Sequence, residues 1–283
     1  MAVFTSFMRS SLFPSVLGLS LLILLGAGCR GGGDPPAPPT PPDPTAIFGS
    51  SDATSTLPSD PVGMSCNHEY YPLRLGYFIQ YRTTYPPTSK TPGEGYYALR
   101  VMRVTGDSVY LKSGYDRPSG ARISSDVEYR CIHGGLYEAV YGNTDFLNPG
   151  GTDQNRMEVR TERAEGEFLP RHISAGSRWT SHFKIKITPV DPETVDLDGR
   201  TLPPVGMSVD VERHAIGVEH VRVPTGEYDA MKIETATFID DHLSMMGTEW
   251  WVKNVGMVKS TYAAGRGADQ NIVTEATTVT VPR

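Results

Sequence analysis

The chain has 283 residues, of which 39% are hydrophobic and 20% are charged, so it carries enough apolar material for a folded core. Its 26 Lys and Arg stand against 32 Asp and Glu, which gives a formal net charge of −6. Because the chain also lacks a basic run, its composition argues against electrostatic binding of nucleic acid.

Residues 1–28 predict an export signal. They carry one charge, Arg9, ahead of an apolar stretch from Ser11 to Leu25, and small residues follow that stretch. A basic start, an apolar middle and small residues before a cut are typical of secretory signal peptides. The alternative is a plain transmembrane anchor, but the stretch is shorter than the roughly 20 residues of a spanning helix and contains Pro14.

The run Gly26-Ala27-Gly28-Cys29 resembles the lipobox of bacterial lipoproteins, with Gly26 at a position where Leu is commoner. The resemblance implies that Cys29 becomes the mature N-terminus and carries several acyl chains, palmitate among them, which together give stable membrane anchoring. Arg30 follows, where an Asp would retain such a protein in the inner membrane. The resemblance therefore implies an outer-membrane lipoprotein that faces the periplasm or the cell surface.

Residues 29–64 predict a disordered tether between the lipidated cysteine and the folded domain. Three glycines follow Arg30, and residues 34–44 contain seven prolines. Proline favours the extended polyproline II helix, so this stretch alone spans about 30 Å. A proline-rich ligand for a partner module is the less favoured interpretation.

Two cysteines are left once Cys29 is acylated. Exported proteins meet an oxidising compartment, so we expect Cys66 and Cys131 to form a disulfide bond. Two free thiols or a metal-binding pair are the alternatives. The sequence has no Cys-x-x-Cys, which leaves thioredoxin-like redox chemistry and c-type haem attachment without support.

Residues 65–283 predict a single β-rich domain. The clearest strand, 182–187, alternates polar and apolar residues strictly. Other strands are expected at 77–84, 96–105, 108–115, 125–132, 136–141, 156–162, 208–212, 231–239, 248–253, 255–263 and 273–281. Turn residues separate them at 105–108, 133–135, 224–227 and 254–256. We predict an all-β, long, curved and mainly antiparallel sheet, and the sequence leaves open whether it closes. Residues 143–154 are expected to form a loop, and 189–206 a long connection that is a candidate flap.

The chain offers little that points to catalysis. It has no His-Glu-x-x-His, no Gly-x-Ser-x-Gly and no phosphate-binding glycine loop before a helix. The run Asp240-Asp241-His242 favours a solvated turn over a cation site. We therefore expect no enzyme activity, catalytic residue, metal or cofactor.

Aromatic residues give a weak indication of a surface that binds a ligand or partner. Trp250 and Trp251 are neighbours on one strand, so their indoles should lie on opposite faces of the sheet. Trp179, Tyr77 and Tyr81 join them as candidate contacts for a ligand or partner. Packing within the sheet and its core is the competing and favoured use, because aromatic residues favour strands.

Four phrases together resemble uncharacterised envelope lipoproteins of bacteria, namely 71–82, 175–179, 221–233 and 250–259. These proteins are in part similar to the half-barrel of the LolA/LolB-like lipoprotein carriers. The resemblance implies a curved antiparallel sheet in the form of a half-barrel or open barrel, and it supplies no catalytic residues.

Our leading hypothesis is a membrane-anchored, non-enzymatic module that binds or assembles a protein partner or an envelope polymer. The alternative is a carrier of an acyl chain or another hydrophobic ligand, which needs a concave apolar cavity. A glycan or ester hydrolase is the third, disfavoured hypothesis, and it needs two carboxylates or a Ser–His pair in a cleft.

Overall fold

The computed structural model describes residues 66–86, 93–116, 122–146, 157–189, 203–264 and 271–282. Within these ranges the chain forms strands and turns and no helix, and hence no helix able to cross a membrane. The predicted signal peptide, Cys29 and the tether fall outside the described residues. So do 147–156 and 190–202, which hold parts of the expected loop and of the candidate flap.

The strands cover most of the described residues. They are β1 (Cys66–His68), β2 (Tyr71–Leu73), β3 (Phe78–Tyr85), β4 (Gly93–Thr105), β5 (Ser108–Asp116), β6 (Arg122–Ile132), β7 (Gly135–Phe146), β8 (Met157–Gly166), β9 (Arg178–Pro189), β10 (Val205–Val223), β11 (Gly226–Ile239), β12 (His242–Val252), β13 (Gly256–Ala264) and β14 (Asn271–Thr280).

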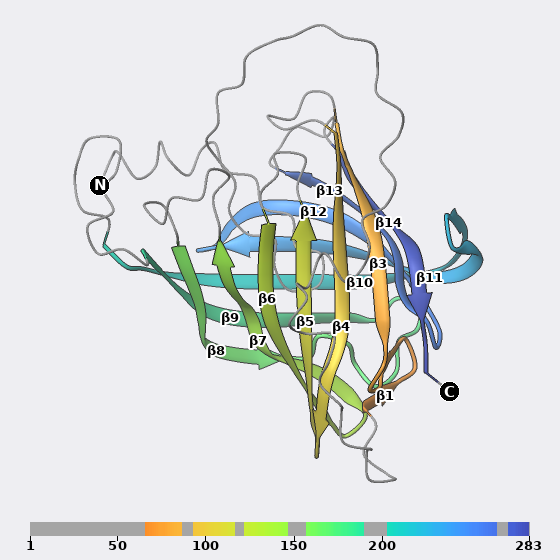
Figure 1. The fold of residues 1–283 in the computed structure, drawn as a ribbon, viewed down its shortest axis with the longest axis horizontal. Helices are drawn as coiled ribbons and strands as arrows, with labels where there is room; N and C mark the ends of the chain where they lie inside the picture. The colour runs from red at the N-terminus through yellow and green to blue at the C-terminus, as the bar shows by residue number, and fades with distance from the viewer. Residues whose placement is uncertain are drawn as a thin grey trace, which may run out of the picture.

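Strands β3 to β14 form one antiparallel sheet that closes into a barrel, in the order β10-β11-β12-β13-β14-β3-β4-β5-β6-β7-β8-β9. In Figure 1 the strands β3 to β7 run steeply across the front, β8 bends at the left toward the direction of β9, and β9 to β12 cross behind. The predicted curved antiparallel sheet is confirmed. It goes beyond a half-barrel because β9 pairs with β10 from Arg178↔His214 to Ile187↔Val205. The described pairing is thinnest between β7 and β8, with Thr144↔Val159 and Asp145↔Glu158.

The expected turns lie between consecutive strands at all four positions. Strand β10, however, has 19 residues, where the alternating pattern predicted five. A bulge between Ala215 and Gly217 shifts the register against β11, which breaks the two-residue period that sequence reasoning follows. Strand β12 likewise begins at His242, earlier than expected, because Asp240 and Asp241 both take positive φ values of 46° and 64° and form a tight turn after β11.

One end of the barrel is closed by the β1–β2 hairpin and by residues 167–177. The imidazole of His68 is hydrogen-bonded through Nε2 to the carbonyl oxygen of Pro170 at 2.8 Å, and the backbone N–H of Asn254 donates to the carbonyl of Glu69 at 2.7 Å. The ring of Tyr71 lies at the centre of this end of the core. Its centroid is 5.6 to 5.8 Å from three neighbouring rings in edge-on geometry, those of Tyr77, Tyr129 and Trp251.

Candidate functional site

Three of the aromatic residues singled out from the sequence are core residues. Tyr77, Tyr81 and Trp251 are each 0% exposed. The Tyr77 hydroxyl donates a hydrogen bond to the carbonyl of Val255 at 2.8 Å, and the Tyr81 hydroxyl donates to the carbonyl of Met257 at 2.9 Å. These contacts tie strand β3 to the β12–β13 turn and to β13. The three side chains therefore stabilise the barrel and present nothing to a partner.

Trp250 lies on the opposite side of β12 from Trp251, in the arrangement that strand geometry predicts. It is nevertheless only 8% exposed. The ammonium groups of Lys232 and Lys259 each lie 5.9 Å from its ring centroid, and its Nε1 donates to Glu219 Oε1 at 3.3 Å. The predicted pair of indoles thus does not form an exposed aromatic face.

The fifth candidate, Trp179, is half-buried at the start of β9. Its Nε1 donates a hydrogen bond to the carbonyl of Phe168 at 2.9 Å. That bond fixes the segment that closes the barrel end, so the described geometry gives Trp179 a structural role.

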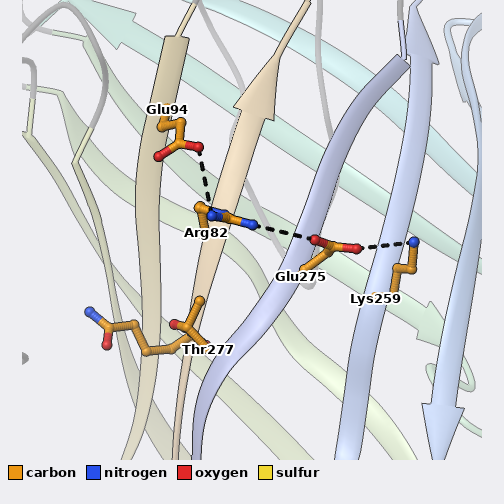
Figure 2. A network of polar contacts seen from close by, with 6 residues as sticks. Arg82, Glu94, Lys259, Glu275 and Thr277 are labelled. Carbon is orange, nitrogen blue, oxygen red and sulfur yellow. Dashed lines mark hydrogen bonds and ion pairs between the residues drawn. The ribbon is translucent and has the colours of Figure 1, made fainter. Parts of the chain in front are cut away.

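Charged side chains cross the outer wall next to Trp250. Arg82 on β3 pairs with Glu94 on β4 at 3.8 Å and with Glu275 on β14 at 3.7 Å, and Glu275 also pairs with Lys259 on β13 at 3.0 Å. Figure 2 shows these four side chains in one line across neighbouring strands. We call the set Glu94, Arg82, Glu275 and Lys259 the outer ladder. The charges of the outer ladder thus pair with one another.

Below the outer ladder in the same view, a polar contact ties β14 to β3. The Thr277 hydroxyl donates to the backbone carbonyl of Gln80 at 3.2 Å (Figure 2). It lies beside a register shift between Ala276 and Thr278, where the β14–β3 ladder is interrupted. The side chain thus adds a contact between β14 and β3 at the point where the register shifts.

The barrel interior contains three ionisable side chains that the sequence analysis did not single out. Glu138, Arg213 and Glu249 are 3%, 7% and 3% exposed. Arg213 donates to Ser181 Oγ at 3.0 Å, and its guanidinium carbon lies 4.9 Å from the centroid of Phe168. The sequence did contain a signal for Arg213. It continues the alternation of the buried apolar residues before it in β10, so an extended strand would direct it inward.

The two buried glutamates have different surroundings. Glu249 accepts hydrogen bonds from Trp251 Nε1 at 2.8 Å and from the Tyr262 hydroxyl. Neither carboxyl oxygen of Glu138 has a hydrogen-bond partner among the described residues. Burial raises the pKa of Glu138 to about 8, with the nearby Arg213 acting against the rise and Glu249 adding to it. Burial therefore favours the neutral form of the Glu138 carboxyl group.

Buried tyrosines surround these groups. Burial raises the pKa values of Tyr71, Tyr97, Tyr129 and Tyr262 above the ordinary value of 10.0. The interior is thus filled by neutral phenols and indoles around a small polar cluster. The carboxyl groups of Glu138 and Glu249 lie among these rings.

Cys131 is disulfide-bonded in the structure. Its partner is not among the side chains that the structure describes, so the Cys66–Cys131 pairing stays a prediction. The backbone favours it. Tyr71, in the strand that pairs with β1, contacts Tyr129 on the strand that carries Cys131, at a ring separation of 5.8 Å.

The β10–β11 hairpin continues beyond the barrel wall as a two-stranded ribbon, which we define as residues 216–230. Pairing of β10 with β9 ends at His214, and β11 pairs with β12 only from Met231 onward. In the described structure, β10 has no second strand beside it from Ile216 to Val223. The hairpin is visible at the right of Figure 1. The ribbon therefore carries a free strand edge.

The two sides of the ribbon differ. Val221 and Val223 are buried against the main core, and this holds the ribbon in place. Val218 is 67% exposed on the other side, next to the solvent-exposed His220 and Arg222. The ribbon thus combines a fixed backbone with an unpaired edge and an exposed apolar side chain, which is the pattern that strand-pairing partners use.

Within the described ranges, no three His, Cys, Asp or Glu side chains gather as a metal ion would require. The Asp240-Asp241 run is used by the fold. Asp240 accepts a hydrogen bond on Oδ1 from the backbone N–H of Ser208 at 2.9 Å, and its own N–H donates to the carbonyl of Ser208 at 3.0 Å. The solvated turn that the sequence favoured is what the structure has.

Comparison with known proteins gives partial matches. A model of the DUF3108-like family matches residues 151–267, a span that contains β8 to β13. No curated protein matches the chain.

Two solved structures are similar. One is a protein of Bacteroides fragilis described as exported and as having a YmcC-like fold, with 13% identity and a TM-score of 0.49 over 75% of this chain and 99% of its own. The other is a protein of Parabacteroides distasonis described as a lipoprotein, with 14% identity and a TM-score of 0.47 over the same shares. The resemblance to the lipoprotein-carrier half-barrel stays a prediction.

Proposed function

We propose that this chain is a lipid-anchored protein of the bacterial envelope, held in the outer membrane through Cys29, and that its barrel is a non-enzymatic docking module. The free edge of β10 in the ribbon carries the proposal. Val218 is 67% exposed beside that edge, and the buried Val221 and Val223 fix the backbone in an extended form. A preformed edge binds a partner strand without an ordering cost on its own side.

The partner we propose is an extended segment of another envelope protein that adds to β10 as a further strand. Backbone hydrogen bonds provide the affinity in this mode, and side-chain contacts provide the selectivity. Glu227 and Asp229 already pair with Arg222 and His220 across the ribbon, so a strongly charged partner gains little there. An apolar side chain next to Val218 fits the edge better.

The carrier hypothesis has less support. It requires an apolar cavity inside the barrel, and the interior contacts instead join tyrosines, Phe168 and Trp251 ring to ring. The candidate flap that would cover such a cavity falls largely outside the described residues.

The test is photo-crosslinking from Val218 in the full chain, expressed in its native envelope. A photoreactive phenylalanine at Val218 should give one discrete protein adduct, and the same probe at the exposed Lys186 on β9 should not. Hairpin geometry sharpens the test. The two-residue turn Pro224-Thr225 makes Val223 and Gly226 the first hydrogen-bonded pair, so alternation directs the N–H of His220 toward the free edge.

His220→Pro removes that edge donor while sparing the pairing with β11, and His220→Ala is its matched control. The Val218 adduct should disappear in the proline variant and persist in the alanine variant. Equal adducts in both variants, or equal adducts from Val218 and Lys186, would show that the edge is not the docking surface.

A further inference from the structure

A depression of about 620 Å³ lies on the outer surface at the closed end of the barrel, away from the ribbon edge. The residues that line it come from three segments that are distant in the sequence, namely Asn67 and Glu69, His133 and Gly134, and Arg171 and His172. The β1–β2 hairpin, the β6–β7 turn and the closing segment thus meet here. The described chain also begins at this place, at Cys66, directly after the predicted tether.

Arg171 is the main positive charge of this depression. Its stem lies over the β6–β7 turn, where a Cβ added to Gly134 would come 2.9 Å from Arg171 Cδ and 3.0 Å from Cγ. Among the described residues, its side chain makes no hydrogen bond or ion pair. The guanidinium therefore lies in the depression with its donors unused, and a planar fork of donors is the group that binds carboxylate and phosphate oxygens in pairs.

The carboxylates nearby are already engaged. Glu69 forms an ion pair with Lys253, and Glu167 accepts a hydrogen bond from the Tyr137 hydroxyl at 3.1 Å. The side-chain oxygen of Asn67 accepts two hydrogen bonds from Arg74, which leaves the Asn67 amide nitrogen as a donor.

Two imidazoles complete the lining. His133 takes a positive φ of 52° in the turn beside Gly134, and His172 follows Arg171 in the closing segment. Each can donate a hydrogen bond from a ring nitrogen. The lining thus combines one unpaired guanidinium, two imidazoles and an amide donor, and its one carboxylate is neutralised.

We propose that this depression binds a phosphate group, with Arg171 as the paired donor and with His133, His172 and Asn67 as further donors. The phosphate can belong to a free anion or to a lipid headgroup, and the chemistry of recognition is the same. The proposal is independent of the docking edge on β10, because the two surfaces share no residue.

The test uses the full chain purified in a non-ionic detergent, with inorganic phosphate titrated in by calorimetry at constant ionic strength. The wild-type chain should bind phosphate saturably, and Arg171→Ala should weaken binding at least tenfold. Arg178→Ala is the matched control, because Arg178 is also exposed and without a partner among the described residues but does not line the depression. The control should bind like the wild type.

Two further measurements separate the alternatives. Arg171→Lys keeps the charge but loses the fork, so binding should fall between the wild type and Arg171→Ala. Micelles doped with phosphatidylglycerol should compete with phosphate if a headgroup is the natural occupant, whereas phosphatidylcholine-doped micelles report nonspecific lipid effects. If neither lipid competes, the occupant is a free phosphate.

Equal phosphate binding by the wild type, Arg171→Ala and Arg178→Ala would overturn the proposal, and so would the absence of saturable binding by the wild type. Circular dichroism and melting temperatures of all variants should match, because both arginines are exposed. Loss of the Val218 crosslink in envelopes bears only on the docking function. Failure of either proposal therefore leaves the other unaffected.

Discussion

Glu138 and Glu249 are both 3% exposed inside the same barrel, but only Glu249 receives hydrogen bonds. Trp251 Nε1 and the Tyr262 hydroxyl donate to Glu249, whereas both oxygens of Glu138 have no hydrogen-bond partner among the described residues. A buried carboxylate without donors is disfavoured in its charged form. Glu138 therefore contributes a pH-dependent term to the stability of the barrel.

The first prediction concerns Glu138→Gln. The folded-state pKa of about 8 lies above the ordinary 4.5, so the folded protein retains a proton that the unfolded chain releases between these values. Stability is thus highest below pH 4.5 for this group, and it falls by about 1.4 kcal/mol per pH unit as the pH rises toward 8. Glutamine cannot titrate, so the variant should lack this decline. Urea unfolding at pH 5, 6, 7 and 8 measures it.

Glu128→Gln is the control for that series, because Glu128 is on the neighbouring strand but partly exposed. Its pH profile should follow that of the wild type. A Glu138→Gln profile parallel to the wild type would mean that Glu138 is charged in the folded barrel.

The second prediction is a steep alkaline transition. Burial raises the pKa values of Tyr71, Tyr77, Tyr81, Tyr97 and Tyr129 above the ordinary 10.0. The folded form keeps these phenols protonated while the unfolded chain ionises them, so stability is present below pH 10 and is lost as the pH rises above it. Each contributes about 1.4 kcal/mol per pH unit, and the barrel should unfold cooperatively within one to two units.

Tyrosinate absorbance near 295 nm and far-ultraviolet circular dichroism should then change together above pH 10. Gradual ionisation of all tyrosines with an unchanged circular dichroism spectrum would contradict the burial argument.

A third prediction concerns Gly256→Ala. Gly256 has φ of 116°, and an added Cβ would collide with the Tyr77 hydroxyl. The substitution should cost about 1 kcal/mol for the positive φ and a further 1–3 kcal/mol for displacing Tyr77 from its hydrogen bond to Val255. Gly176→Ala is the control, because Gly176 has φ of 87° with open space around it. Chemical denaturation should show the larger loss at Gly256; equal losses would mean that the turn relaxes freely.

The outer ladder gives a fourth prediction. Glu275→Gln weakens the contacts to both Arg82 and Lys259, but the Arg82 side chain is 38% exposed and the Glu275 side chain 22% exposed. Partly exposed pairs are screened, so the loss should be about 1 kcal/mol or less and should shrink in 1 M salt. A double-mutant cycle of Glu275→Gln with Arg82→Gln measures the coupling. A coupling above 2 kcal/mol would show that the ladder is effectively desolvated.

The fifth prediction is the Cys66–Cys131 bond. The mature chain should be two hydrogens lighter before reduction than after it, and peptide mapping should recover Cys66 linked to Cys131. Closing a loop of about 65 residues stabilises by about 4 kcal/mol in the chain-entropy account. Cys131→Ser should lower the unfolding free energy by up to that amount. A linkage between Cys131 and Cys29 would contradict both the pairing and the lipidation of Cys29.

The local sequence pattern was sufficient to predict many strands and turns of the barrel. Alternation at 182–187 predicted a strand because successive side chains on a strand point to opposite faces, and β9 contains this run. The turn at 133–135 was predictable because glycine tolerates positive φ, and Gly134 has φ of 86°. Adjacency on a strand also predicted that Trp250 and Trp251 point to opposite sides.

Closure of the sheet was decided by the tertiary structure. The pairing of β9 with β10 depends on the twist accumulated over all twelve strands of the barrel, and a short stretch of sequence does not contain that information. The same holds for burial. The sequence placed one of the two neighbouring indoles away from the core, whereas both are buried, and Glu219, Lys232 and Lys259 from neighbouring strands contact Trp250.

The sequence by itself thus determined most of the strands and their turns, and it predicts the export and lipidation signals, because each depends on neighbouring residues. The free edge of β10, the unpartnered Glu138 and the convergence of Asn67, His133 and Arg171 were decided by the tertiary structure alone. Each of these joins or separates segments that are far apart in the chain, and only long-range packing sets those relations.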